Sequence, residues 1–359
     1  MRSKMTFPEL EVVAAFDIDR TRLAAFCAYW KISAAESLDE LLADGHNSPD
    51  LILNLTNPDA HFEVSYACLS AGKHVYSEKP LATNMDDARK LCALAESKSL
   101  RLASAPCSLL GEAAQTAWLA LREKTIGKPL LVYAEIDDDF VSKAPYLKWR
   151  SESGAPWPYR DEFSIGCTLE HAGYYLTWLM AMFGSVETVI AASAVLVEQK
   201  VDNNSQSAPD FSCAILFFKC GVVARLTCSI IAPHNHSLRI IGDTGLLEID
   251  QCWDNEAAVR IRRRFVLRRK LMNSPFARRF RIRGATHPKT ARWGAAAMNF
   301  ALGPAEVLAS IKETRPSRLS IGFALHLNEV TLAIQSGGGL KVMETVCPPV
   351  EPMPWAKLS

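Results

Sequence analysis

The chain has 359 residues and a mass of 39.6 kDa, a length that suggests two domains. Hydrophobic residues make up 49% and charged residues 22%, which is ordinary for a globular protein and excludes a disordered chain. The 40 Lys and Arg and the 39 Asp and Glu leave a net charge of +1, so no overall field attracts nucleic acid or a membrane surface.

Residues 10–126 alternate between short apolar runs typical of buried strands and longer segments typical of helices. Ser37 and Glu40 form a capping box, and Asn84 is a further helix-starting residue. This alternation indicates parallel strands joined by crossover helices, an α/β domain over residues 1–126. The predicted strands are Leu10–Phe16, Leu51–Leu55, His74–Glu78 and Leu100–Ala103, and the predicted helices include Thr21–Trp30, His61–Ser70 and Glu112–Lys124.

The pattern changes in residues 127–359, where strand-like runs follow one another without helices between them. This succession predicts an α+β domain with a large, mainly antiparallel sheet. We expect one helix over Glu170–Phe183, two more within Ala295–Glu313 and Ile321–Gln335, and a Pro- and Trp-rich loop over Pro145–Phe163. The predicted strands are Leu130–Ile136, Val189–Leu196, Ser212–Phe218, Val222–Ile231, Ser237–Ile241 and Leu246–Ile249.

The ten cysteines are scattered, none forms a C-x-x-C pair, and most lie in apolar runs. This usage indicates free thiols in a reducing compartment. The N-terminus lacks the apolar core of a signal peptide, and Gly184, Ser185 and Glu187 interrupt the longest apolar stretch. We therefore expect a soluble, cytoplasmic protein.

Polar or turn residues stand at or just after the ends of the early strands. In an open parallel sheet, ligands bind beyond these carboxyl ends. An acid at the end of an early strand suits the hydroxyl groups of an adenosine ribose, and a lysine at the end of a central strand suits a proton donor or acceptor beside a cofactor. The segments concerned are Asp17, Thr56-Asn57-Pro58, Glu78-Lys79-Pro80 and Ser104-Ala105-Pro106.

Three short segments carry a more specific pattern. Residues 71–82 read AGKHVYSEKPLA, residues 56–61 read TNPDAH and residues 242–249 read GDTGLLEI. They resemble the AGKHVxxEKPLA signature, the TPxxxH turn and the GxxGxLEI strand of the glucose–fructose oxidoreductase/inositol dehydrogenase/MocA family. The similarity runs from about residue 7 to about residue 335, and the three motifs together with the domain order make it specific.

The resemblance implies an NAD(P)-dependent oxidoreductase whose Rossmann domain is followed by a domain with a large, often dimer-forming sheet. Substrates in this family are usually sugars, cyclitols or their derivatives. By resemblance, Lys79 is the proton relay beside the nicotinamide, and the Lys79–Pro80 peptide is cis. The positions that match cofactor contacts are Asp17, Thr56, Asn57, Pro58, His61 and Glu78, together with Lys79.

The second catalytic motif of the family, D-x-G-x-H, falls on residues 170–174. Glu170 takes the Asp position and Tyr174 the His position, although the glycine is displaced by one residue. His171 lies next to them, so either Tyr174 or His171 is the second proton-handling residue. Asp17 favours NAD over NADP because it repels a 2′-phosphate, although Arg20 and Arg22 lie close enough to reverse that preference.

The largest departure from the family is at the N-terminus. The chain contains no G-x-G-x-x-G turn, and it begins at what resembles the end of the helix that follows this turn. We therefore expect a Rossmann domain that is incomplete at its N-terminus, with the neighbours of its central strand unpaired. Either the start lies downstream of the true one, which favours an enzyme, or the copy is decayed. The second case favours a non-catalytic relative that binds ligands or serves assembly.

Three remaining features are weaker. His234 and His236 share a face of a strand, but no third ligand is evident, so we expect no metal. Residues 260–283 hold eleven Lys and Arg and no acid, which indicates half-exposed strands at a sheet edge, a phosphorylated or nucleotide-linked substrate, or an acidic partner. Trp149, Trp157 and Tyr159 suit either stacking on a sugar ring or packing beneath their own loop.

The strand-like segments Val189–Leu196 and Val222–Ile231 are apolar at both alternating sets of positions. Strands with this pattern are buried on both faces. Because we find no second layer in the chain to cover them, we expect a homodimer, or a tetramer built from it, joined through an open-faced sheet. The expected partners are thus a small sugar-like substrate and further copies of the chain, with no nucleic acid and no membrane.

Overall fold

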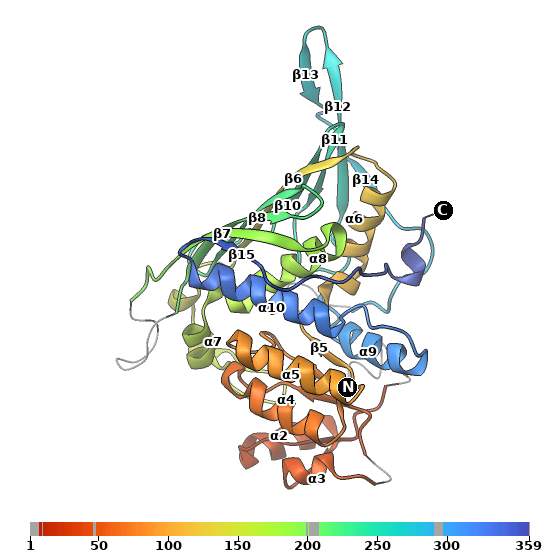
Figure 1. Cartoon of the computed structure of the whole chain (residues 1–359). Coiled ribbons are helices and arrows are strands. Elements are labelled where there is room, and N and C mark those ends of the chain that lie inside the picture. Colours follow the sequence, from red (N-terminus) through yellow and green to blue (C-terminus); the bar gives the residue numbers. More distant parts are fainter. Residues whose placement is uncertain are drawn as a thin grey trace.

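The computed structural model describes residues 7–8, 10–45, 48–198, 200, 208–290 and 297–358. Helices α2 to α5 surround short parallel strands at one end of the molecule, and a long sheet with helices on one face forms the other end (Figure 1). This is the predicted order of an α/β region followed by an α+β region. No helix in the described residues is long and apolar enough to cross a membrane.

The N-terminal region contains five short parallel strands and four helices. Ser37 Oγ accepts from Glu40 N–H (3.0 Å) and Asn84 Oδ1 accepts from Asp87 N–H (2.9 Å), so both predicted helix caps are confirmed. The strands are β1 (Ala14–Ala15), β2 (Ser33–Ala34), β3 (Leu51–Asn54), β4 (His74–Ser77) and β5 (Leu102–Ser104); the helices are α2 (Arg20–Trp30), α3 (Leu38–Leu42), α4 (His61–Ser70) and α5 (Met85–Ser97).

The strands of this region form two separate sheets. Within the described residues β1 pairs with β2 alone, whereas β3, β4 and β5 form their own three-stranded sheet. The family's central strand would lie between β1 and β3. In the described residues these two strands have no such shared partner, as the sequence predicts. The predicted strand over Leu10–Phe16 is wrong in length, since only Ala14 and Ala15 pair; an apolar run extends as a strand only where a partner backbone lies beside it.

The C-terminal region is built on one long sheet in the order β13-β12-β11-β10-β6-β9-β8-β7-β15, with β14 paired to β12. Among the described strands of this sheet only β6 and β9 pair in parallel, so the sheet is mainly antiparallel, as predicted. Its strands are β6 (Pro129–Asp137), β7 (Val186–Ala194), β8 (Phe211–Phe218), β9 (Val223–Ser229), β10 (Leu238–Gly242), β11 (Gly245–Ile249), β12 (Val259–Leu267), β13 (Lys270–Asn273), β14 (Arg278–Phe280) and β15 (Gly339–Val342).

The basic stretch forms the edge of this sheet, and the β12–β13 hairpin projects beyond its body (Figure 1). All four residues of β13 are exposed. The interpretation as half-exposed strands near the sheet edge is therefore confirmed for β12, β13 and β14, whereas residues 281–283 lie outside any strand.

Helices cover one face of the long sheet (Figure 1). Tyr175, Trp178 and Phe323 are fully buried beneath it, and Ala324 of α10 belongs to the N-terminal core instead, so α10 joins the two cores. Helix α6 lies in the core of the long sheet, although the predicted boundary at residue 126 places it in the first domain. These helices are α6 (Glu112–Arg122), α7 (Tyr159–Ile165), α8 (Gly173–Phe183), α9 (Leu302–Lys312) and α10 (Ile321–Ser336).

Two predicted segments differ from the structure. The loop over Pro145–Phe163 contains the start of α7, whose first turn carries Asp161 and Glu162, and acids in this position stabilise a helix. The helix over Glu170–Phe183 begins instead with a π-helical turn, Thr168–Ala172, before α8. Trp149, Trp157, Tyr146, Tyr159 and Phe163 pack edge-on or tilted against one another, which favours packing beneath the loop over stacking on a sugar.

The outer face of the sheet is less uniform than predicted. Ile190 and Ile215 lie opposite each other on β7 and β8 and are 38% and 40% exposed. On β9 the outward position opposite Ile215 is Arg225, which also pairs with Glu135. The prediction that β9 is apolar on both faces is therefore wrong, because its alternation exposes a charged side chain. Val222 is buried at 5% exposure.

Candidate active site

A buried ion pair joins the two regions. Lys79 follows β4, and its Nζ contacts Oε2 of Glu170 in the π-helical turn. The side chains are 19% and 6% exposed. The Lys79–Pro80 peptide is cis, as predicted. The two residues that the sequence selected from segments 91 positions apart thus meet in the structure.

Three carboxylates act on the Lys79 ammonium. Burial lowers the pKa of Lys79, but the charges of Glu170, Glu162 and Glu78 outweigh this effect and raise the pKa above its ordinary value. Burial raises the pKa of Glu170 to about 8; Lys79 opposes this shift, and a hydrogen bond with Glu162 adds to it. Glu170 therefore gains or loses a proton near pH 8, while Lys79 keeps its proton to higher pH.

His171 and Tyr174 lie beside Glu170. Burial lowers the pKa of His171 to about 4, so its imidazole is neutral, and its Nε2 lies 3.8 Å from Asp138 Oδ2. Burial raises the pKa of Tyr174 well above 10, so its phenol keeps its proton. Both rings contact Trp253, with centroid distances of 5.9 and 5.8 Å. Either side chain is thus placed to assist Glu170, and the two sequence alternatives stay open.

The turn after β3 is held together by His61. This side chain is fully buried, and its Nδ1 and Nε2 lie 2.6 Å from Pro80 O and 2.9 Å from Thr56 O. His61 thus ties the Thr56 turn to the Lys79–Pro80 turn. Both ring nitrogens are occupied by main-chain oxygens, so His61 acts on any ligand through these turns. Asn57 points elsewhere and donates to Asp161 Oδ2 (2.9 Å) on α7.

Asp17 lies just after β1. Its Oδ1 accepts from Asp19 N–H (2.8 Å), and its Oδ2 lies 3.4 Å from Arg22 Nε. Asp19 in turn caps α2 and accepts from Arg22 N–H (3.0 Å). The Arg22 guanidinium is therefore already engaged by two acids, and Arg20 donates to Glu36 O.

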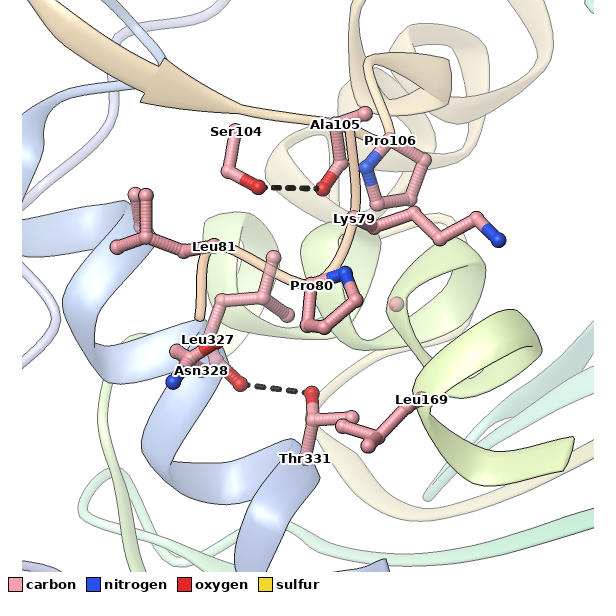
Figure 2. Close-up of a pocket in the computed structure, with 12 residues that line it drawn as sticks. Lys79, Pro80, Leu81, Ser104, Ala105, Pro106, Leu169, Leu327, Asn328 and Thr331 are labelled. Carbon is pink, nitrogen blue, oxygen red and sulfur yellow. Dashed lines mark hydrogen bonds between the residues drawn. The ribbon is translucent and has the colours of Figure 1, made fainter. Parts of the chain in front are cut away.

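A small cavity of about 20 Å³ lies behind the Lys79 turn, enough for about one water molecule. Figure 2 shows Pro80 facing the α10 residues Leu327 and Thr331 across it, while the Lys79 side chain points away. The cavity thus lies on the Pro80 side of the turn. Nζ of Lys79 points away from the cavity and contacts Glu170.

Sequence reasoning missed several residues that surround this pair. Glu162 lies in the segment read as a loop, while Asp138 follows β6 and therefore obeys the same strand-end rule that selected Lys79. In the described residues, nine buried side-chain polar atoms lack a hydrogen-bond partner. Three of these nine belong to one neighbourhood, since both histidine rings contact Trp253: His171 Nδ1, His236 Nε2 and Trp253 Nε1. Such a concentration is typical of a site that a ligand completes.

A parallel-stranded region with a proton-carrying lysine at a strand end, joined to a large antiparallel sheet, defines a two-domain dinucleotide-binding oxidoreductase. Residues 2–105 match the model of the oxidoreductase family with an NAD-binding Rossmann fold, and residues 114–248 match that of the GFO/IDH/MocA C-terminal domain. The chain belongs to this family. Its expected fold and its cofactor, NAD, are those of the family.

Curated relatives include oxidoreductases with and without a known activity. Trans-1,2-dihydrobenzene-1,2-diol dehydrogenase of Sus scrofa is 26% identical over 247 residues, which cover 68% of this chain and 68% of that protein. An uncharacterised oxidoreductase of Schizosaccharomyces pombe is 43% identical over 83 residues, which cover 23% of this chain and 22% of that protein.

Solved structures share the fold over nearly the whole chain. An NAD-binding oxidoreductase from Klebsiella pneumoniae superposes with a TM-score of 0.74 at 18% identity, covering 93% of this chain and 91% of that one. The WlbA dehydrogenase from Bordetella pertussis, solved with NADH and UDP-GlcNAcA, gives a TM-score of 0.65 at 18% identity and covers 95% and 91%.

Proposed function

We propose that this protein transfers a hydride between a nicotinamide cofactor and the carbinol carbon of a sugar, a cyclitol or a related compound. The observation that carries this proposal is the buried Lys79–Glu170 pair at the carboxyl end of β4. Alcohol oxidation must remove a hydroxyl proton together with the hydride, and a buried amine–carboxylate pair is suited to take it. The nicotinamide ring supplies the hydride chemistry when it is bound.

The pair handles protons as one unit. With one proton shared between Lys79 and Glu170, it accepts the hydroxyl proton of an alcohol; with two protons, it donates one to a carbonyl oxygen. Glu162 adds a second carboxylate that stabilises the doubly protonated form. His171 or Tyr174 assists, His171 as a neutral imidazole and Tyr174 as a neutral phenol.

The cofactor fits the described residues at its nicotinamide end. We assign Lys79, Glu78 and the Thr56–Pro58 turn to this end, and Asp17 to the adenosine ribose. Arg22 pairs with both Asp17 and Asp19. In the described residues no unpaired cation therefore lies beside Asp17 to bind a 2′-phosphate. NAD is therefore the favoured cofactor, and NADP binds more weakly.

The substrate class rests on the relatives. The dehydrogenase of Sus scrofa is named for a cyclic trans-diol, and the structure from Bordetella pertussis holds a nucleotide sugar. A solved structure from Acidithiobacillus ferrooxidans is a UDP-N-acetylglucosamine 3-dehydrogenase. All three names point to ring-bound secondary alcohols, so a substrate of this kind is the first choice for this chain.

A second candidate function follows from the split N-terminal sheet. In the described residues the β1–β2 pair is not joined to the β3–β4–β5 sheet, and the sequence given contains no G-x-G-x-x-G segment. This arrangement favours a non-catalytic protein that binds a ligand near Asp138 and Trp253 or serves assembly. Such a protein binds NAD no better than it binds AMP.

Calorimetric titration with NAD, NADP and AMP separates the two candidates, followed by turnover assays with sugars, nucleotide sugars, cyclitols and cyclic trans-diols. For the enzyme we expect NAD to bind more tightly than NADP, and at least one substrate to reduce NAD. Lys79→Met should then lower kcat by about 10²–10⁴, the usual contribution of a positioned proton carrier. Lys312→Met, at the exposed end of α9, is the matched control and should leave kcat unchanged. NAD binding that is no tighter than AMP binding, without turnover on any substrate, supports the second candidate.

A further inference from the structure

Asp138, His234 and His236 form a compact group, which we call the histidine–aspartate cluster. One nitrogen or oxygen from each side chain lies within 4.8 Å of the other two. The fold builds this group through a two-way backbone pairing, in which Asp137 N–H donates to Asn235 O (3.0 Å) and Asn235 N–H donates to Asp137 O (2.9 Å). This pairing places the residue after β6 beside two histidines that are two positions apart. The third ligand that the sequence did not reveal is therefore Asp138.

Gln251 orients the His236 ring. Its Oε1 accepts from Trp253 N–H (3.0 Å), which fixes the orientation of the amide, and the same oxygen accepts from His236 Nδ1 (2.8 Å). The proton of His236 thus lies on Nδ1, and Nε2 carries a lone pair. His236 is 1% exposed, and this Nε2 has no hydrogen-bond partner among the described residues. A buried imidazole lone pair held by an outer amide is the arrangement found in metal-binding histidines.

The charges of the cluster suit a cation. The buried His236 ring offers a lone pair at Nε2, and close to it lies the half-buried carboxylate of Asp138. In the described part of the chain the only ion-pair partners of this carboxylate are two imidazoles, those of His171 (3.8 Å) and His234 (3.7 Å). A half-buried carboxylate without a permanent positive charge beside it is stabilised by a bound cation.

His234 is the adaptable member of the group. The Gln251 amide nitrogen lies 3.1 Å from its Nε2 and donates to it, which places the His234 proton on Nδ1, toward Asp138. To bind a cation through Nδ1, His234 must carry its proton on Nε2 instead. Nε2 then no longer accepts the hydrogen bond from Gln251, so this contact breaks. The His234 side chain is 41% exposed, so it is free to turn. Closing the three ligands to the spacing around zinc needs a shift of roughly 1 Å.

We propose that Asp138, His234 and His236 bind one divalent transition-metal ion of the zinc type. Two imidazoles and one carboxylate are the ligand set that zinc takes in sites with an open coordination position. His171 Nε2 lies 3.8 Å from Asp138 Oδ2, and Glu170 precedes His171 in the π-helical turn, so the ion lies near the proposed proton pair, where it takes an oxygen of the substrate. This last role rests on the proposed function, whereas binding of the metal does not.

Zinc and cobalt titrations of the full-length protein, after chelator dialysis, test the site without any assay of activity. We expect one ion per chain and visible Co²⁺ absorption bands of four- or five-fold coordination. His236→Gln should weaken zinc binding by more than about 100-fold, because loss of a residue that merely orients a ligand already weakens it by roughly 10–100-fold. Asp138→Asn should weaken it similarly. His74→Gln is the matched control, since His74 lies on β4 in the three-stranded N-terminal sheet, whereas the cluster belongs to the long sheet.

Two outcomes overturn the proposal. One is a wild-type protein whose Co²⁺ spectrum is that of the free aqueous ion, which is decisive even if a variant fails to fold. The other is zinc affinity that is equal in wild type, His236→Gln and Asp138→Asn, with circular dichroism confirming that the variants are folded. Either result leaves the Lys79–Glu170 chemistry untouched, so failure of the metal site and failure of the proposed function are distinguishable.

Discussion

At the scale of single residues, the site depends on how burial and charge act together on one carboxyl group. Glu170 is almost fully buried, and burial raises its pKa to about 8 although the Lys79 ammonium is in contact with it. Burial outweighs the effect of the ammonium, and the hydrogen bond and negative charge of Glu162 raise the pKa of Glu170 further. Near neutral pH the group therefore changes its proton content with small changes in pH.

This behaviour predicts opposite pH profiles for the two directions of the reaction. Above about pH 8 Glu170 loses its proton and the pair accepts one from an alcohol, so kcat/KM for oxidation should rise through this pH. Carbonyl reduction needs the extra proton, so its kcat/KM should fall through the same range. Glu170→Gln should remove this inflection from both profiles, whereas Glu123→Gln, on the α6 C-cap, should leave both unchanged.

A pH profile of oxidation that falls between pH 7 and 9 contradicts the assignment of the proton to Glu170. Lys79 itself contributes an ionisation only at higher pH, because the surrounding acids raise its pKa. His171, whose pKa burial lowers to about 4, is already neutral in this range and adds no inflection.

Single residues also show how far sequence reasoning reaches. Lys79 and Glu170 were predictable because a strand-end rule and a family motif point to them. His61 was assigned to the cofactor, yet its ring holds two turns together, a role that depends on carbonyl oxygens brought close by folding. Asp138 and Trp253 were missed because folding brings them to residues that are distant in the sequence: Asp138 lies beside His171 and His234, and Trp253 beside His171.

At the scale of elements, the link between α9 and α10 depends on one buried acid. Glu306 on α9 accepts two hydrogen bonds from the Arg315 guanidinium (2.6 and 3.0 Å) and one from Arg318 Nη1 (2.9 Å). Its side chain is 3% exposed, and that of Arg318 is 9% exposed. The hydrogen bonds to Glu306 raise the pKa of Arg315 further. The acid thus pairs with two guanidinium groups that precede α10, and Glu313 provides a second negative charge beside Arg315.

Removal of this acid should destabilise the protein. Glu306→Gln leaves the mostly buried Arg318 without an ion-pair partner in the described residues and leaves Arg315 with Glu313 alone, and we expect a loss of about 3 kcal/mol in the free energy of unfolding. Urea denaturation followed by circular dichroism measures it. Glu313→Gln serves as the control, because Glu313 is exposed and pairs only with Arg315 in the described residues; its loss should change stability by less than about 1 kcal/mol. Equal effects of the two substitutions contradict the role of Glu306.

The elements themselves were largely predictable, and the exceptions have local causes. His61–Ser70 is confirmed at both ends because an apolar face and a following glycine delimit it. The π-helical turn at Thr168–Ala172 was not predictable, since one additional residue in a helix leaves the apolar pattern nearly unchanged. Strand β2 was missed because two residues carry no detectable period.

At the scale of the whole molecule, the outer face of the long sheet is divided into two halves. Across β15, β7 and β8 a row of apolar side chains runs through Leu340, Ile190 and Ile215. The same row continues over β9, β6 and β10 as Arg225, Tyr133 and Arg239. Both arginines lie over the Tyr133 ring, at 4.6 and 5.5 Å from its centre. The apolar half has no cover among the described residues.

We predict that a second copy of the chain covers this apolar half about a two-fold axis. Light scattering at micromolar concentration should give twice the chain mass, or four times for a tetramer of such dimers. Ile215→Glu should lower this to the mass of one chain while the protein stays folded. Leu147→Glu, at a position 60% exposed outside the sheet, should leave the mass unchanged. Val222 is unsuitable for this test because it is buried within one chain. A wild-type monomer contradicts the prediction.

The separation of β1 and β2 from the other parallel strands bears on how easily this segment unfolds locally in solution. The buried side chains of this segment, Leu23, Cys27 and Ala35, belong to neither of the two cores. A segment with few core contacts unfolds locally at low free energy, so its amide protons should exchange with deuterium sooner than those of α4 and α5. Asp17 lies on this segment, so a dinucleotide that contacts Asp17 binds only when the segment is folded. Saturating NAD should therefore slow exchange in α2 far more than in α5, and its affinity is lowered by the entropy lost in this ordering.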